Sequence, residues 1–107
     1  MPAYAAANLG KVELGPEIIA YVEQIDATLA PFGGRFLIHG GAKTVLEGRW
    51  PGDLIVIEFP DRPTAQAWYQ SAAYQRILPL RKDHAEGDVI IVDGVPPGHR
   101  ATDILPS

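Results

Sequence analysis

The sequence predicts a single α+β domain in which strands and helices follow one another as βαββαβ, giving an antiparallel sheet with helices on one face. Three observations support this prediction. The 107 residues fit the usual size of one domain. One apolar stripe recurs at helical spacing. Two short runs are rich in β-branched residues and bounded by turn residues. We expect the domain to cover residues 1–95 and a surface tail to cover residues 96–107, where the composition turns to Pro, Gly and polar residues.

The first half of the chain supplies one strand, one helix and a second strand. Residues 3–9 are expected to form the first strand, which Gly10 ends. Pro16 suits a first helical turn, and an apolar stripe then runs for about four turns through Ile18, Val22, Ile25 and Leu29. Residues 31–34 contain Pro and a Gly pair that stop this helix. Residues 35–39 are expected to form the second strand, and residues 45–50 to extend a hairpin arm.

The strand expected at residues 53–59 is apolar on both faces until Glu58. Ile55, Ile57 and Phe59 point one way, while Leu54 and Val56 point the other. The last strand has the same character, with two apolar residues on each face, at 89–92. Two helices can cover only one face of so small a sheet. The second apolar face therefore predicts a partner, most simply the same face of an identical chain.

The segment between those strands predicts a helix in two parts. Asp61 can cap a helix whose apolar face carries Ala65, Trp68, Tyr69 and Ala72. Ser71 is a second capping residue, and the helix should continue from there to about residue 84. Pro79 lies inside this continuation and removes a backbone donor, so we expect a kink or a break there.

Composition excludes several classes of function. Nine basic residues against 13 acidic ones give a net charge of −4, and no basic run would neutralise a phosphate backbone, so nucleic acid is not an expected partner. With no cysteine, disulfides, iron–sulfur clusters and thiolate zinc sites are excluded. The three histidines lack metal-ligand spacing, so no metal is expected. No cofactor is expected either, and haem is disfavoured but stays open because His39 and His84 could be axial ligands. Because no segment has the length of a membrane span or the pattern of a signal peptide, we expect a cytoplasmic protein without membrane contact.

A set of short motifs, taken together and in order, resembles a known bacterial family. The motifs occupy residues 30–37, 46–50, 58–60, 67–71, 74–75 and 80–81, within a match that runs from about residue 3 to 95. The family is called domain of unknown function 1330. The resemblance implies a ferredoxin-like chain that pairs into a dimeric α/β barrel, and it supplies no established activity. His39 lies where an arginine is common in relatives, which weakens any anion-binding role carried over to that position.

Arg81 is the strongest candidate for binding a ligand. On a continuous helix it shares one side with Tyr74, Ile77 and Leu78, so its guanidinium lies in the middle of an apolar face and needs a partner. A substrate carboxylate or enolate oxygen is one candidate partner. An internal ion pair with Glu47 or Glu58, or a side chain that extends to the surface, is the alternative.

Three further residues are candidates for moving a proton: Glu47, Glu58 and His39. Each glutamate lies in or beside an apolar strand, and a carboxylate half buried in a cleft can act as an acid or a base. The alternative is that each closes a hydrogen-bond network, for example with Arg35. By strict alternation His39 shares a strand face with Leu37 and Arg35, from where it would enter a cleft and titrate near neutrality.

Aromatic residues complete the candidate binding site. The ligand-binding set that we expect consists of Arg81, Arg35, Trp50, Trp68, Tyr69 and Tyr74. Trp68 and Tyr69 are adjacent on a helix and diverge by about 100°, so one should pack against the sheet while the other lines a cleft or a dimer seam. Packing of both, without ligand stacking, is the alternative.

The sequence thus predicts a homodimer with a small, mostly apolar cleft per subunit that binds a small organic molecule, which we expect to be acidic. Two functions stay open at this point. One is cofactor-independent chemistry on that molecule, and the other is a non-enzymatic binding or stress-associated dimer whose polar residues are structural.

Overall fold

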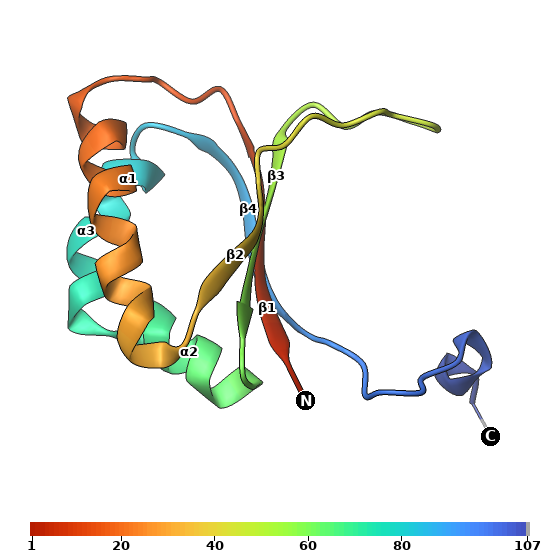
Figure 1. Ribbon diagram of the computed structural model, residues 1–107. Coiled ribbons are helices and arrows are strands. Elements are labelled where there is room, and N and C mark those ends of the chain that lie inside the picture. The colour runs from red at the N-terminus through yellow and green to blue at the C-terminus, as the bar shows by residue number, and fades with distance from the viewer. Residues whose placement is uncertain (107) are drawn as a thin grey trace.

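Four antiparallel strands form one sheet in the order β2-β3-β1-β4 (Figure 1). The computed structural model describes residues 1–106. Its strands and helices are β1 (Ala3–Gly10), α1 (Pro16–Leu29), β2 (Arg35–His39), β3 (Asp53–Phe59), α2 (Arg62–Gln70), α3 (Ala72–Lys82) and β4 (Glu86–Asp93). Two short 3₁₀ helices cover Ala30–Phe32 and Ala101–Ile104. This arrangement confirms the predicted α+β fold, with the second helix of the βαββαβ order divided into α2 and α3.

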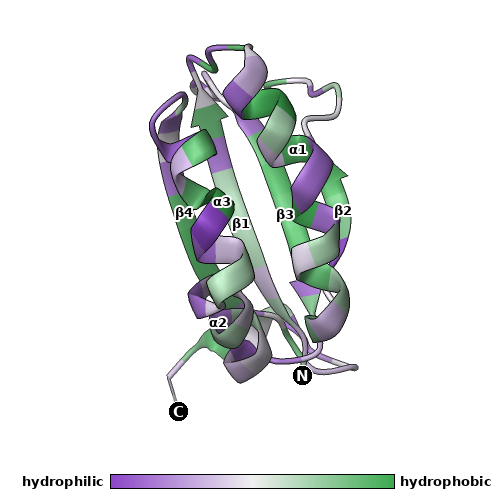
Figure 2. Cartoon of the chain, turned by 90° about the vertical axis from the view of Figure 1, so that its left-hand side faces the viewer, coloured by the Kyte–Doolittle hydropathy of each residue, from purple (hydrophilic) through white to green (hydrophobic). Residues whose placement is uncertain are grey.

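The three α-helices all lie on one face of the sheet. Figure 1 shows the three α-helices on the left of the sheet, and no helix or strand of residues 1–106 packs on the right-hand face of the strands. In Figure 2, seen from the helix side, hydrophobic stretches of strand lie behind α1 and α3, while hydrophilic residues are on the helix surfaces turned to the viewer. We call the uncovered side of the sheet the open face.

Side-chain caps begin α2 and α3 as the sequence predicts. Asp61 Oδ1 accepts a hydrogen bond of 2.8 Å from the Thr64 amide, and hydrogen bonds from Thr64 lower the pKa of Asp61. Ser71 Oγ accepts a bond of 3.2 Å from the Tyr74 amide and donates one of 2.7 Å to the Trp68 carbonyl. Ser71 therefore ends one helix and starts the next.

Of the kink or break expected at Pro79, the break does not occur. The helix α3 continues across this proline to Lys82, and the amide of Asp83 donates a 3.0 Å hydrogen bond to the Pro79 carbonyl. Proline removes only one backbone donor, and the buried side chains of Ile77 and Leu78 hold the helix against the domain.

A register irregularity in β2 changes the face on which His39 lies. Arg35 lies opposite Glu58 and Phe36 opposite Ile57, but the register then shifts, so that His39 lies opposite Ile55. Residues that lie opposite one another share a face, so His39 is on the helix side with Phe36. The alternation that grouped His39 with Arg35 is wrong, because the bulge adds one residue to the strand.

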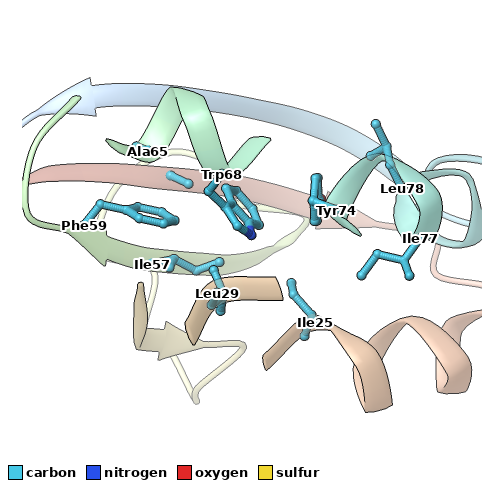
Figure 3. Close-up of a cluster of buried hydrophobic side chains, with 10 residues drawn as sticks. Ile25, Leu29, Ile57, Phe59, Ala65, Trp68, Tyr74, Ile77 and Leu78 are labelled. Atoms are coloured by element: carbon cyan, nitrogen blue, oxygen red, sulfur yellow. The ribbon is translucent and has the colours of Figure 1, made fainter. Parts of the chain in front are cut away.

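The core lies between the helices and the sheet. Phe59, Trp68 and Tyr74 form a row of packed rings within it (Figure 3), with ring centroids 5.2 Å apart for Phe59 and Trp68 and 4.2 Å apart for Trp68 and Tyr74. Ile25 and Leu29 close the row from α1. Val22, expected in the same apolar stripe, is instead 49% exposed.

Two segments project from the domain on the side of the open face (Figure 1). We call residues 40–52 the arm and residues 94–106 the tail. The arm was expected to extend a hairpin at residues 45–50, and it has no strand structure there. The radius of gyration is 15.3 Å, whereas a compact chain of this length has about 13 Å. None of the helices in residues 1–106 has the length and apolar character needed to cross a membrane.

Candidate functional site

A cavity of about 50 Å³ lies between the helices and the sheet, on the helix side. Most of its lining is apolar and comes from β1, β3 and α1. Four polar side chains also line it: Tyr21, His39, Tyr74 and Arg81. Val22 and Val89, at 49% and 40% exposure, are part of the lining, so the cavity opens to solvent at this rim. The site is thus a small, mostly apolar pocket with a few convergent polar groups.

Tyr21 from α1 and Tyr74 from α3 meet inside this cavity. Their hydroxyl oxygens are 2.8 Å apart and their rings are in an edge-to-face arrangement. One hydroxyl donates to the other, and the accepting hydroxyl keeps its own proton. The pair therefore has one O–H left to donate to a third group.

Arg81 lies beside this tyrosine pair. Its guanidinium carbon is 5.8 Å from the centre of the Tyr21 ring, within the range of a cation–π contact. Arg81 is only 9% exposed, so the alternative of a side chain that extends to the surface is wrong. Among residues 1–106, no carboxylate lies within ion-pair distance of Arg81. The expected internal ion pair with Glu47 or Glu58 is therefore not formed.

The protonation states of these groups make them donors. Burial raises the pKa of Tyr21, and neighbouring Tyr74 raises it further, so the phenol stays neutral. Burial acts to lower the pKa of Arg81, but Tyr74 and Tyr21 outweigh it and the net change is upward. The cavity thus holds the charged guanidinium of Arg81 beside the neutral hydroxyl of Tyr21, and no acidic side chain of residues 1–106 lines it.

Trp68 forms part of the wall and has its polar group engaged elsewhere. Its indole Nε1 donates a 3.0 Å hydrogen bond to Thr28 Oγ1, which in turn donates a 2.7 Å bond to the Ile25 carbonyl. Tyr69 is partly buried at the edge of the core, with its ring 5.5 Å from that of Tyr74. Trp68 is 2% exposed, packs in the core and also lines the cavity, whereas Tyr69 packs at the edge of the core and does not line the cavity.

His39 lies at the β2 side of the cavity. Its ring is stacked on that of Phe36, with centroids 4.3 Å apart and an interplanar angle of 13°. His39 is thus the one predicted proton-moving residue that the structure brings into the same cavity as Arg81.

The other predicted site residues lie elsewhere. Arg35 and Glu58 form an ion pair of 2.8 Å on the open face of the sheet. Glu47 and Trp50 are exposed in the arm, where they line a second hollow, described below. The expected site is therefore divided among the cavity, the open face and the arm.

Sequence reasoning did not single out Tyr21, which completes the polar group of the cavity. The signal was available, since Tyr21 is three residues after Ile18 and four before Ile25, on the edge of the same helical stripe. Within residues 1–106 no group of three or more His, Asp or Glu side chains is arranged to hold a metal ion. The chemistry that these residues offer is hydrogen bonding and charge stabilisation of an anionic group.

Comparisons with known proteins support this architecture. A family profile described as "Domain of unknown function (DUF1330)" matches residues 2–95. No curated protein matches the chain. The crystal structure of the methylated RPA0582 protein, which is from Rhodopseudomonas palustris, is 17% identical, with 92% of this chain and 84% of that chain covered and a TM-score of 0.68.

Two other solved structures have the same fold. A protein from Jannaschia sp. CCS1, described as a dimeric ferredoxin-like protein of unknown function, is 11% identical over 88% of this chain and 100% of that one, with a TM-score of 0.66. HapK from Hahella chejuensis is 20% identical over 94% and 99%, with a TM-score of 0.56. At such low identity these likenesses establish the ferredoxin-like fold and nothing about the ligand.

Proposed function

The chain belongs to the family described as domain of unknown function (DUF1330), and we propose that it is a homodimer whose subunits each bind a small organic acid in the cavity between the helices and the sheet. Binding without chemistry has the best support, because only one of the three residues expected to move a proton, His39, lines the cavity. The fold alone leaves the activity undefined.

One observation carries the ligand part of this proposal: Arg81 is buried beside the hydrogen-bonded pair of Tyr21 and Tyr74, with no carboxylate from residues 1–106 in ion-pair range. A buried charge is stable only when it is paired or well hydrogen-bonded. A carboxylate or enolate oxygen in the cavity would accept hydrogen bonds from the guanidinium and from the free hydroxyl of the tyrosine pair. The apolar walls would take the hydrocarbon part of the molecule.

The open face of the sheet supports the dimer part. Ile38, Ile90 and Val92 lie on this face and are 41%, 56% and 42% exposed. An apolar surface of this kind on a sheet is typical of a protein–protein contact. The solved structure from Jannaschia sp. CCS1, described as a dimeric ferredoxin-like protein, is consistent with a second copy as the partner.

Arg81→Met is expected to abolish the stabilisation of the protein by small organic acids while leaving the fold intact. The measurement is the melting temperature with benzoate, phenylacetate or pyruvate, each compared with its neutral amide. The wild type should respond to an acid and not to its amide, because only the carboxylate pairs with Arg81. Loss of a charge-assisted hydrogen bond weakens binding by about 10- to 100-fold. Methionine is unbranched and flexible, so it should fill the space of the arginine stem.

Arg76→Met is the matched control, since Arg76 is exposed on the same helix. It should leave the response to acids unchanged. If no acid raises the melting temperature of the wild type, and Arg81→Met lowers stability by several kcal/mol, Arg81 is a structural residue and the binding proposal fails.

Ile90→Asp is expected to convert the dimer to a monomer without unfolding it. The side chain is 56% exposed in the single chain, so the aspartate costs little there, but in a dimer it would be a buried, unpaired charge. Ile19→Asp, at a 48% exposed position on α1 away from the open face, is the control and should stay dimeric. Mass measured in solution at micromolar protein distinguishes the two. A wild-type chain that is monomeric under these conditions would refute the dimer.

A further inference from the structure

The arm and the open face together enclose a second, larger hollow. Its volume is about 590 Å³, and its lining combines arm residues with Ile38 and Leu54 of the sheet. Leu46 and Trp50 border it and are 89% and 45% exposed. An apolar hollow of this size on an uncovered sheet face is a surface that a partner would cover.

The tail carries the complementary apolar side chains. Val95, Ile104 and Leu105 are 55%, 77% and 65% exposed. Ile104 ends a short 3₁₀ helix, Ala101–Ile104, and Leu105 follows it. The start of this helix is closed by the 3.0 Å hydrogen bond that the Arg100 amide donates to Asp103 Oδ2. The end of the tail is thus a formed structure that presents apolar residues to solvent.

The two segments leave the sheet at opposite ends of its strands. The arm joins β3 at Asp53, which lies opposite Leu9 at the end of β1. The tail follows Asp93 of β4, which lies opposite Ala3 at the start of β1. These ends are about 24 Å apart for an extended strand of eight residues. Both segments project toward the open-face side in Figure 1.

A twofold axis explains how they meet. If two copies pack open face to open face about an axis perpendicular to the strands, one copy is turned end for end relative to the other. The arm of each copy, at the β2–β3 edge, then lies at the same end of the strands as the tail of its partner, which leaves from β4 at the other edge. This occurs twice in one dimer, and the tail must cross the sheet to reach the arm. An axis parallel to the strands would instead bring arm against arm and tail against tail.

The area of the sheet face gives an independent argument. Strands about 4.8 Å apart and about 24 Å long give a four-stranded face of roughly 450 Å². A stable interface buries about 800 Å² on each partner. The arm and the tail are the surfaces on the same side that can supply the difference.

We infer that the hollow between the arm and the open face binds the end of the tail of a second copy of this chain, with Ile104 and Leu105 packed against Leu46 and Trp50. This inference rests on the proposed dimer. It adds the residues that join the copies and the direction in which one copy is turned on the other.

Disulfide trapping tests the inference, because the chain has no native cysteine. In the double variant Leu46→Cys/Leu105→Cys, mild oxidation should cross-link two chains and give a covalent dimer on a non-reducing gel. Each single variant is the matched control, since like positions would lie at opposite ends of the dimer. The double variant should cross-link at least about tenfold faster than either single variant. The dimer holds the two thiols next to each other, which gives them a high effective concentration.

The outcomes separate this inference from the dimer itself. A double variant that is dimeric by mass yet forms no cross-link between chains, or only one within a chain, contradicts the contact of arm and tail and leaves the dimer standing. Single variants that cross-link as fast as the double variant would show that like segments meet. A monomeric mass for the wild type removes both proposals.

Discussion

Trp68→Ala should lower the free energy of unfolding by about 4 kcal/mol, the usual cost of truncating a fully buried tryptophan. The indole is 2% exposed and packs between the rings of Phe59 and Tyr74. Its removal leaves a cavity in the core and takes away the hydrogen bond to Thr28. Urea unfolding measures this decrease in the free energy of unfolding. Wild type and variant are compared at the same protein concentration, because the stability of a dimer depends on it.

Trp68→Phe is the matched variant for the tryptophan. It keeps an aromatic ring in the core but cannot donate to Thr28, so it should cost clearly less than the alanine variant. A loss under about 1 kcal/mol for Trp68→Ala would mean that the core is not centred on this ring.

Gly87→Ala should destabilise the protein by about 3 kcal/mol or more, because the new methyl group has no room. Gly87 has a backbone φ of +150°, which residues other than glycine rarely adopt. A Cβ at this position would overlap the carbonyl oxygen of Asn8 on β1. The overlapping atom belongs to the backbone, so relief requires a shift of β4 against β1. The melting temperature and the urea midpoint both report this change.

Gly41→Ala controls for the loss of a glycine. A Cβ at Gly41 meets no atom within 4 Å and the backbone there does not need a positive φ, so the change should stay within about 0.5 kcal/mol. If Gly87→Ala is as mild as Gly41→Ala, the pairing of β1 with β4 differs from that described.

Local patterns in the sequence were enough to predict the fold. They were most reliable where a residue acts on its own neighbours in the chain, as a helix-capping residue does. Asp61 and Ser71 cap their helices because their side-chain oxygens accept from the backbone three residues on. The strands with apolar residues on both faces correctly indicated that one face of the sheet is not covered by helices. Pro79 was misleading because tertiary packing outweighs the loss of a single backbone donor.

The site could be predicted only in part, because it depends on how elements pack. The helical spacing of Tyr74 and Arg81 put both on the buried side, and the structure agrees. Their actual partner, Tyr21, comes from another helix, which no local pattern connects to α3. The face of His39 depends on a bulge in β2, and an insertion of one residue is invisible to simple alternation. Glu47 and Glu58 were grouped with Arg81 because residue type suggested a partner, while the register of β3 puts Glu58 on the other face.

A crystal structure of the protein with the most stabilising acid of the benzoate, phenylacetate and pyruvate series tests the central claim most directly. We expect the ligand in the cavity, with a carboxylate oxygen about 2.8 Å from a guanidinium nitrogen of Arg81 and within hydrogen-bond distance of the hydroxyl of Tyr21 or Tyr74. An acid bound only in the hollow beside the arm, or a cavity in which Arg81 pairs with a side chain of the protein itself, would contradict the account.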